Sequence, residues 1–435
     1  MSYLLNAIYL CALATLSPWL VYKAITTGKY RRGLWAKLTG ATSLSPGNPV
    51  WFHGVSVGEI HLLRQVIARW RHRHPDGQCI ISTTTDTGFE EAKKHFPDVP
   101  IIYWPFDFSW AVERALRDIA PRLVVLAEGE IWPNFLLAAK RRGIPVATIN
   151  GRMSPRSLAR YQKLSALVRP LFRKLDLLAM QTERFAQGVR QLGARPERVA
   201  VTGNVKFDGV RSDRQNPKTL ELAQLLDVRS GDLVWIAGST QAPEEEIALD
   251  IYRRAKAEQP ALRLILVPRQ RERFDEVARL LERSGLSYLR RSQLEPRSVA
   301  LGLRSSIILV DTIGELGALW GLADVAYVGG SMDGRRGGQN MIEPAAYGAA
   351  VLFGPHVWNF RETVEQLLQR QAAVQIEDAA ELEEVVFRLL ADADERQRRG
   401  AAAQRYVLEQ QGATERTLDL LDQLLGQRAA RRQAA

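Results

Sequence analysis

The sequence predicts an α/β protein with two domains, each built on a mostly parallel, doubly wound sheet. Apolar runs of strand length alternate with segments of helical periodicity over two long stretches of the chain. A polar stretch at residues 211–230 separates the two series, and 435 residues exceed what one hydrophobic core usually supports. These observations favour two Rossmann-like domains that face each other across a cleft, with the site in that cleft.

The individual elements follow from the same alternation. In the first series we expect strands at residues 49–53, 79–84, 101–104, 123–127, 146–150, 177–180 and 199–202. Helices are expected between them, at residues 60–72, 88–95, 109–118, 132–142, 158–172 and 182–192. In the second series we expect strands at residues 233–238, 262–268, 287–289, 307–310, 325–328 and 350–353. Strands that alternate with helices predict parallel sheets.

The domain boundaries follow from the breaks in this rhythm. We expect an N-terminal apolar segment at residues 1–40, a first domain at 41–210, a linker at 211–230, a second domain at 231–412 and a C-terminal helix with a basic tail at 413–435. Residues 379–425 are rich in helix-forming residues, and the tail at 428–432 is expected to fray.

The N-terminal segment has the length of a membrane-associated helix. Residues 1–22 carry no charge and are mostly apolar, although Asn6 and Pro18 weaken the apolar run. A basic stretch follows and contains Lys23, Lys29, Arg31, Arg32 and Lys37. By the positive-inside rule, the rest of the chain is then expected in the cytoplasm. The two interpretations are a membrane anchor or interfacial helix, and a buried helix that packs on the first domain.

Charge and composition narrow the possible partners. The formal charge is +11 and the pI is about 9.8, which favours an acidic partner such as nucleic acid, an anionic membrane or a phosphorylated substrate. No acidic residue interrupts residues 140–174, and apolar residues accompany the basic ones, which suits an anionic interface or a phosphorylated amphipathic ligand. A solvated basic helix face is the alternative. The segment lacks the aromatic interleaving of a nucleic-acid surface.

Cysteine and histidine usage argues against metal and disulfide chemistry. The chain has two cysteines far apart, Cys11 and Cys79, and its six histidines include no His-Glu-x-x-His motif. We therefore expect no disulfide framework, no protein-bound metal ion and no cofactor.

Carboxylates follow two apolar strands of the first series. Glu59 comes after the strand at 49–53 and a glycine-containing turn, where it starts a helix. It is either an acidic residue that complements the helix dipole or a catalytic base. Glu128 and Glu130 follow the strand at 123–127 in the same way, and Lys206 follows the last strand of the series. Because all of these groups follow strand ends, we expect them at one edge of the sheet, and this favours the catalytic interpretation.

Loops in the second series have the composition of a nucleotide site. Ser239 and Thr240 end one strand with small donors, and Arg269 ends another with a guanidinium group suited to phosphate. Further on, a glycine-rich loop leads into Asn340 and Glu343, whose side chains suit ribose hydroxyls. The glycines form neither Gly-x-Gly-x-x-Gly nor a P-loop.

Taken together, these motifs resemble the bacterial 3-deoxy-D-manno-octulosonic acid (Kdo) transferases of lipopolysaccharide biosynthesis. The resemblance runs from the N-terminal segment to about Gly412, and it is carried by residues 53–59, 82–85, 128–134, 150–154, 203–208, 238–240, 311–316 and 337–345. It implies a GT-B glycosyltransferase that moves Kdo from CMP-Kdo to a lipid A precursor at the inner face of the cytoplasmic membrane. It also implies inversion at the anomeric carbon without a metal ion.

The resemblance assigns roles to individual residues. It implies Glu59 as general base, with Glu130 and Lys206 stabilising the transition state. It implies contacts to CMP from Pro268, Arg269, Ile313, Gly314, Glu315, Asn340, Met341, Ile342 and Glu343. For the acceptor and its phosphates we expect contacts from Ser56, Arg152, Arg156, Arg160, Ser239 and Thr240. Gln241 and Gln339 stand where the family usually has His, and glutamine does not titrate near neutral pH.

Two other classes of function remain as alternatives. Another GT-B enzyme, such as a nucleotide-sugar epimerase or a different lipid glycosyltransferase, shares the expected fold. An epimerase that hydrolyses its nucleotide sugar would consume the sugar with no acceptor present. A basic nucleic-acid-binding protein belongs to a different class and does not explain the carboxylates at the strand ends.

Overall fold

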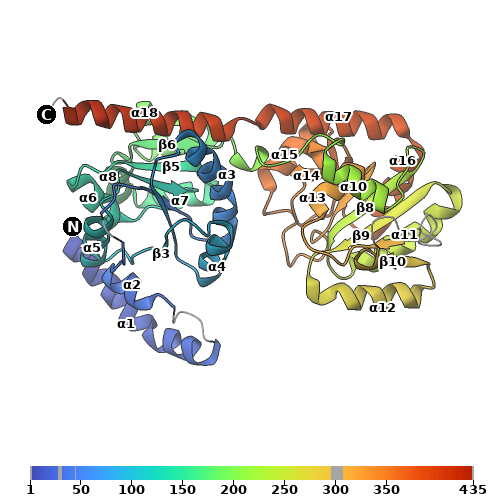
Figure 1. Ribbon diagram of the computed structural model, residues 1–435, viewed down its shortest axis with the longest axis horizontal. Helices are drawn as coiled ribbons and strands as arrows, with labels where there is room; N and C mark the ends of the chain where they lie inside the picture. Colours follow the sequence, from blue (N-terminus) through green and yellow to red (C-terminus); the bar gives the residue numbers. More distant parts are fainter. Residues whose placement is uncertain (1, 28–31, 45, 295–306, 434–435) are drawn as a thin grey trace. The chain divides into compact units, whose positions relative to one another are not determined.

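The computed structural model describes residues 2–27, 32–44, 46–294 and 307–433, and the chain divides into two compact units. The first unit combines the N-terminal 209 residues with residues 410–435, and the second contains residues 210–409. Each unit contains one sheet of seven parallel strands (Figure 1). The predicted fold class, two Rossmann-like units, is therefore confirmed.

In the first unit the sheet has the strand order β3-β2-β1-β4-β5-β6-β7. Its strands are β1 (Val50–His53), β2 (Cys79–Thr83), β3 (Ile101–Tyr103), β4 (Leu123–Ala127), β5 (Val146–Gly151), β6 (Leu177–Met180) and β7 (Val199–Val201). Its helices are α1 (Ser2–Thr27), α2 (Leu34–Thr39), α3 (Val57–Arg73), α4 (Asp86–His95), α5 (Ser109–Ile119), α6 (Pro133–Arg141), α7 (Pro155–Lys163), α8 (Ser165–Phe172), α9 (Glu183–Gln191) and α18 (Ala413–Gln433), with the short 3-10 helices η1 (Pro196–Arg198) and η2 (Val205–Phe207).

Both faces of this sheet are buried because successive strand residues point to opposite sides. Trp51 of β1 packs in a cluster with residues of α5, α6, α8 and α9. Its neighbours Val50 and Phe52 pack in a second cluster, with residues of α3 and with Leu418 and Leu421 of α18. The C-terminal helix is therefore part of the core of the first unit.

In the second unit the sheet has the order β10-β11-β9-β8-β12-β13-β14. Its strands are β8 (Leu233–Thr240), β9 (Leu262–Pro268), β10 (Tyr288–Arg290), β11 (Ile307–Leu309), β12 (Val325–Val328), β13 (Ala350–Phe353) and β14 (Ala373–Gln375). Its helices are α10 (Pro217–Leu225), α11 (Glu244–Glu258), α12 (Phe274–Ser284), α13 (Leu316–Leu319), α14 (Ile342–Ala346), α15 (Arg361–Gln369), α16 (Ala379–Ala391) and α17 (Ala393–Gln410), with the 3-10 helices η3 (Arg271–Arg273), η4 (Arg291–Gln293) and η6 (Trp320–Leu322).

The segment predicted to be a linker is instead a helix of the second unit. Asn216 caps α10, because its Oδ1 accepts a hydrogen bond of 3.1 Å from the N–H of Thr219. Leu222 is buried, and the Thr219 hydroxyl donates to the carbonyl of Ala318 at 2.8 Å. The polar residues that suggested a linker are thus the cap and first turn of a packed helix.

Three further elements differ from the prediction. The helix expected at residues 158–172 is two helices, α7 and α8, which meet at Leu164. Strand β14 was not predicted; it has only three residues and ends in the polar Gln375. The basic tail, expected to fray, continues as helix α18 to Gln433.

The N-terminal helix α1 is held on the first unit by polar side chains near its start. Asn6 is buried, and its amide donates to the Ser109 hydroxyl at 2.7 Å. The Tyr9 hydroxyl donates to Asp107 at 3.0 Å, and Asp107 also accepts from the N–H groups at the start of α6. Within the described residues, no helix combines the length and apolarity needed to cross a bilayer.

The expected basic flank of α1 is partly engaged with protein. Lys37 is buried, with its ammonium 4.3 Å from the centre of the Tyr103 ring. Arg32 forms an exposed ion pair of 2.7 Å with Glu90. Lys29 and Arg31 lie outside the described residues, as does the side chain of Lys23.

Candidate functional site

The strand order of the first sheet brings the predicted carboxylates together. From β1 the chain adds β2 and β3 on one side, then returns to place β4 on the other side of β1. Loops that leave neighbouring strands in opposite directions open a crevice at the carboxyl edge, where open α/β sheets bind ligands. Glu59 follows β1, and Glu128 and Glu130 follow β4, so all three lie at this topological switch point.

Glu59 lies in the first turn of α3 and is oriented by two donors. The N–H of Val55 donates to Oε2 at 2.8 Å, and the Ser56 hydroxyl donates to Oε1 at 3.1 Å. Burial raises the pKa of Glu59, and the nearby charge of Glu128 raises it further, while the Val55 hydrogen bond opposes this shift. The carboxylate is half-buried and keeps lone pairs free to accept a proton.

Ser56, predicted to contact the acceptor, is the residue that precedes α3 and is engaged with Glu59. Gly54 allows the turn to pass close to the helix, because a Cβ there would lie 3.1 Å from the Cβ of Glu59. The turn therefore fixes the position of the carboxylate.

Glu128 joins the two predicted cations of this edge. Its carboxylate lies 3.1 Å from Nε of Arg152 and 3.8 Å from Nζ of Lys206. The Glu128 side chain is 15% exposed, whereas those of Arg152 and Lys206 are 58% and 41% exposed. Glu128 was quoted in the sequence motif but not predicted as a site residue. Its pairing depends on a left-handed backbone conformation, with φ of 57°, which the sequence does not reveal.

Glu130 differs from Glu59 because few hydrogen bonds offset the cost of burying its carboxylate. Burial raises the pKa of Glu130 to about 7, and the charge of Glu59 contributes to the shift. Its Oε2 is buried and has no hydrogen-bond partner within the described part of the chain. A carboxyl group whose pKa is raised by burial and by the charge of a neighbouring carboxylate is typical of acid–base sites.

The loop that carries Lys206 is held on two sides. Lys206 lies on η2, and the N–H of Val205 donates to Oδ1 of the buried Asn150 at 3.0 Å. Two residues later, the Asp208 carboxylate accepts from the N–H groups of Gly412 and Thr414 at the start of α18. The C-terminal helix thus helps to fix the loop of a predicted site residue.

The basic segment at residues 140–174 separates into two parts. Lys140 forms an ion pair with Asp176, and Arg141 and Arg142 both pair with Glu113, so two carboxylates offset part of the charge of these three cations. These three side chains are therefore engaged with protein, and the predicted affinity for an anionic ligand rests on the remaining basic residues of the segment.

The part on α7 and α8 is exposed. Helix α7 has no buried residue, and Arg156 and Arg160 point to solvent without a carboxylate partner among the residues described. Leu164 and Leu167 nearby are 51% and 66% exposed, which leaves apolar side chains beside the cations.

In the second unit, the switch point lies between β8 and β12. At the carboxyl end of β8, Ser239 has φ of 57°, and the carbonyl of Thr240 accepts a hydrogen bond of 3.1 Å from the N–H of Arg269. Thr240 is fully buried, and its hydroxyl has no partner in the described structure. The predicted residues Ser239, Thr240 and Arg269 thus lie together at one sheet edge.

Glu244, which was not predicted, organises the glycine-rich loop after β12. This buried carboxylate accepts from the N–H groups of Gln241 and Gly330 at 2.8 Å, of Ser331 at 3.0 Å and of Met332 at 3.2 Å, and from the Tyr327 hydroxyl at 2.9 Å. Gly329 is required at the turn, because a Cβ there would lie 2.6 Å from Oε2 of Glu244. The sequence showed only an acidic first turn of a helix.

Asn340 and Glu343, the two side chains predicted to suit ribose hydroxyls, lie within hydrogen-bond distance of each other. The Asn340 amide donates to Glu343 at 3.0 Å, and Oδ1 of Asn340 accepts from the N–H of Ile342 at 3.1 Å. Burial raises the pKa of Glu343, and the Asn340 hydrogen bond and the positive charge of Arg269 oppose the shift. Arg269 and Glu343 therefore share one electrostatic environment.

Some of the residues assigned to CMP binding are not exposed to solvent. Met341, Ile342 and Pro268 are buried. Glu315 is paired with Arg291 at 2.8 Å and accepts from the Thr312 hydroxyl. Ile313 is 74% exposed, and Gly314 has φ of 93°, so this loop places an apolar side chain in solvent.

Comparison with known proteins identifies the family. A family model described as 3-deoxy-D-manno-octulosonic-acid transferase (kdotransferase) matches residues 28–209. The 3-deoxy-D-manno-octulosonic acid transferase of Haemophilus influenzae is 33% identical over 402 residues, which cover 92% of this chain and 92% of that protein. The corresponding transferase of Bordetella pertussis is 34% identical over 398 residues, covering 89% of this chain and 90% of its own.

The chain belongs to the 3-deoxy-D-manno-octulosonic acid transferase family. This Kdo transferase is therefore an enzyme, a glycosyltransferase, as the sequence motifs predicted. A solved structure of a putative UDP-N-acetylglucosamine 2-epimerase from Listeria monocytogenes superposes with a TM-score of 0.55 at 11% identity, covering 87% of this chain and 97% of that one. The likeness to the epimerase is one of fold alone, and the family relationship does not favour an epimerase.

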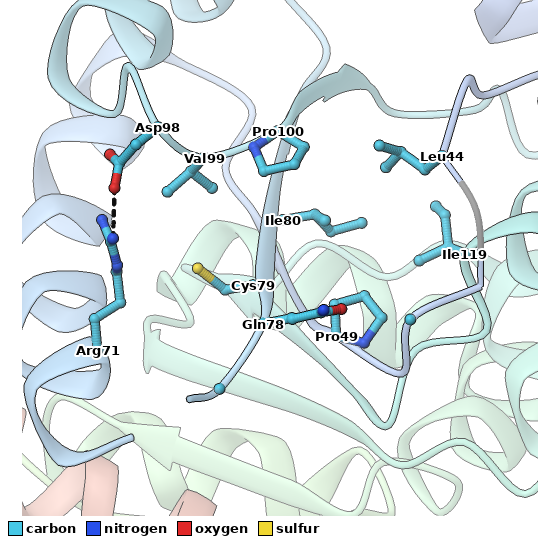
Figure 2. Close-up of a pocket in the computed structure, with 12 residues that line it drawn as sticks. Leu44, Pro49, Arg71, Gln78, Cys79, Ile80, Asp98, Val99, Pro100 and Ile119 are labelled. Carbon is cyan, nitrogen blue, oxygen red and sulfur yellow. Dashed lines mark hydrogen bonds and ion pairs between the residues drawn. The ribbon is translucent and has the colours of Figure 1, made fainter. Parts of the chain in front are cut away.

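A separate cavity of this Kdo transferase lies at the opposite, amino edge of the first sheet (Figure 2). It has a volume of about 380 Å³, and Ile80, Ile119 and Leu44 extend into it. Burial raises the pKa of the Cys79 thiol beside it to about 11, so that thiol stays protonated. None of the predicted site residues lines this cavity.

Proposed function

We propose that this protein transfers Kdo from CMP-Kdo to a sugar hydroxyl of a lipid A precursor, lipid IVA, in lipopolysaccharide biosynthesis, with inversion at the anomeric carbon. The activity itself follows from family membership, and the relatives carry it in their names. The observation that carries the mechanism is the Glu59 carboxylate, which two donors hold at the switch point of the first sheet.

Glu59 acts as the general base. Its carboxylate takes the proton from the attacking hydroxyl of the acceptor as the oxygen forms a bond to the anomeric carbon of Kdo. The bond from that carbon to the phosphate oxygen breaks on the opposite side, and CMP leaves with the electron pair. Attack opposite to the leaving group inverts the anomeric centre.

The neighbouring groups of the first unit stabilise the charges of this step. Glu130 shares its site with Glu59 and, with a pKa of about 7, carries a proton in part of the molecules at neutral pH. Lys206 and Arg152 are half-exposed cations whose shared counter-charge is Glu128. They are suited to the phosphate groups of the acceptor, because charge-assisted hydrogen bonds to phosphate are stronger than neutral ones.

The second unit binds the nucleotide. Arg269 supplies a guanidinium group for the CMP phosphate, and Ser239 and Thr240 lie beside it at the end of β8. Asn340 and Glu343 are suited to the ribose hydroxyls. We propose that these groups stabilise the leaving phosphate and that neither a metal ion nor a cofactor takes part.

The test is Glu59→Gln, assayed with purified protein, CMP-Kdo and a tetra-acylated lipid A precursor, with products identified by mass spectrometry. Loss of the base should lower kcat by about 10²–10⁴-fold, while CMP binding stays unchanged. Glu197→Gln, at an exposed glutamate of the same unit, serves as the matched control. A near-native rate in folded Glu59→Gln protein would reject the assignment, and consumption of CMP-Kdo without acceptor would favour the epimerase class.

We also propose that the protein works at the cytoplasmic face of the inner membrane. Support comes from exposed apolar side chains on and near α1, of which Tyr3, Ile25 and Trp35 are 89%, 69% and 75% exposed. The exposed cations and leucines of α7 and α8 provide a second surface suited to anionic lipid and to the lipid-linked acceptor.

This proposal predicts a charge-dependent affinity for membranes. Arg156→Glu with Arg160→Glu should weaken sedimentation with anionic phospholipid vesicles by about tenfold or more, because each basic residue near such a surface contributes about 1 kcal/mol. Arg184→Glu with Arg195→Glu changes the net charge equally at exposed positions of the same unit and should have a smaller effect. Equal losses in both double variants would contradict a role for α7.

A further inference from the structure

Helices α3 and α4 bring two histidines and a glutamate together on the surface of the first unit. Oε1 of Glu91 lies 3.4 Å from Nε2 of His61 and 2.7 Å from Nε2 of His95. One candidate ligand atom from each of the three residues lies within 4.8 Å of the other two. His61 belongs to α3, whereas Glu91 and His95 are four residues apart on α4.

The chemistry of this set is that of a transition-metal site. Imidazole nitrogen and carboxylate oxygen are ligands of Zn²⁺ and related divalent ions, with bonds of about 2.0–2.2 Å. Two ligands at about 2.05 Å in a tetrahedron are about 3.4 Å apart, which follows from those bond lengths. The His61–Glu91 separation already matches this value, and the 2.7 Å separation of His95 from Glu91 would have to lengthen by about 0.7 Å.

The surroundings leave room for an ion to enter. The side chains of His61, Glu91 and His95 are 49%, 23% and 18% exposed, so the Glu91 and His95 ligands are partly sheltered while His61 opens to solvent. Water can then occupy the fourth position, as in open three-ligand sites.

We propose that His61, Glu91 and His95 form a binding site for a divalent transition-metal ion of the Zn²⁺ class, which joins α3 to α4. The ordinary interpretation of these contacts is a weak Glu91–His95 pair within one helix. That interpretation does not account for His61, which directs Nε2 to the same oxygen from a different helix.

The ion would not take part in the transfer reaction. Residues two apart on a helix point in different directions, so His61 and Glu59 do not share a face of α3. Its effect is on stability, because it fixes the helix that begins at the proposed base. The sequence predicts no protein-bound metal ion, and this proposal departs from that prediction at a surface site that is independent of the proposed function.

The first experiment titrates tag-free, full-length protein with ZnCl₂ in chelator-free buffer, and isothermal titration calorimetry measures the binding. One ion per chain should bind, and at a hundredfold excess over Kd the Tm should rise by about 5 °C or more. Co²⁺ in place of Zn²⁺ should give the visible absorption of a low-symmetry site with nitrogen ligands.

Variants identify the ligands. His61→Ala, Glu91→Gln and His95→Ala should each weaken Zn²⁺ binding by about tenfold or more, and the Co²⁺ spectrum should change in each. His72→Ala, at an exposed histidine of α3, is the matched control and should bind as the parent does. Circular dichroism of the metal-free variants shows whether each remains folded. No saturable Zn²⁺ binding, or binding that all three folded variants retain, would overturn the proposal.

Discussion

At the residue scale, the carboxyl groups of Glu59 and Glu130 lie in similar places but have different partners. Glu59 accepts from a main-chain N–H and a hydroxyl, both of which favour the ionised form. Glu130 leaves one oxygen buried without a hydrogen-bond partner in the described structure, and it also feels the charge of Glu59. The difference in partners suits a base beside a group that still holds a proton.

This difference predicts how stability depends on pH. Glutamate in an unfolded chain has a pKa of 4.5, whereas that of Glu130 in the folded protein is about 7. Between these values the folded state holds a proton that the unfolded state has lost, so this residue lowers stability as the pH rises through the window. Glu130→Gln removes the effect.

The measurement is the difference in Tm between Glu130→Gln and the parent protein at pH 5 and at pH 8. Relative to the parent, the free energy of unfolding of the variant should rise by about 1 kcal/mol between pH 5 and pH 8. This value allows for the solvent screening of a half-buried group. Glu197→Gln should show parallel curves with the parent. A constant difference for Glu130→Gln would mean that its pKa is not raised.

Single residues also show what a sequence can and cannot predict. Glu59 could be predicted, because strand, turn and helix start are all visible as local patterns. Glu128 and Glu244 could not be assigned partners, since these come from loops distant in sequence and from left-handed turns. The family resemblance assigned Met341 and Ile342 to CMP binding, but both residues are buried.

At the scale of elements, strands were easier to predict than the segments that join them. A strand buried on both faces is a continuous apolar run, so β1, β4 and β9 stand out in the sequence. Asp213, Asn216 and Pro217 precede or start helix α10, and such residues are equally typical of a linker and of a helix start. The buried Thr219 and Leu222 separate the two possibilities, and their burial requires the tertiary structure.

The contact of η2 with α18 leads to a prediction at this scale. Asp208→Ala removes the acceptor for the first N–H groups of α18, and loss of a helix cap costs about 1–2 kcal/mol. Because Lys206 lies two residues away, the transfer rate should fall together with the Tm of the first unit. Differential scanning calorimetry and the transfer assay measure the two effects.

Asp419→Ala is the control for this variant. Asp419 lies on the same helix and pairs with Arg73, but its side chain is 59% exposed. An exposed ion pair contributes about 0.2–1 kcal/mol, so both activity and Tm should change little. If Asp208→Ala behaved like Asp419→Ala, the cap would have no role in placing Lys206.

At the scale of the whole molecule, the two units differ in how the chain builds them. The second unit is continuous, from Val210 to Glu409, whereas the first needs both ends of the chain. Leu418, Leu421 and Leu424 of α18 are buried in the same cluster as Phe52 and Trp70. Burial of a leucine contributes about 1.5–3 kcal/mol, and three of them together approach the whole stability of a typical domain.

Deletion of residues 410–435 should therefore unfold the first unit and spare the second. Calorimetry of the full chain should show two transitions, and the deletion should remove or greatly lower one of them. CMP binding, which we assign to the second unit, should survive the deletion while transfer is lost. A shortened protein with both transitions intact would show that α18 is dispensable for the first core.

Because the first unit contains residues 1–209 and 410–435, it can be completed only after α18 has been synthesised. The ribosome adds about 5–20 residues per second, so roughly 10–40 s pass between residue 209 and residue 410. During that interval the domain made second can finish folding while the one begun first still lacks its closing helix. The half that carries Glu59 and Lys206 is completed last, so a prematurely terminated chain would retain the half to which we assign CMP binding but would lack transferase activity.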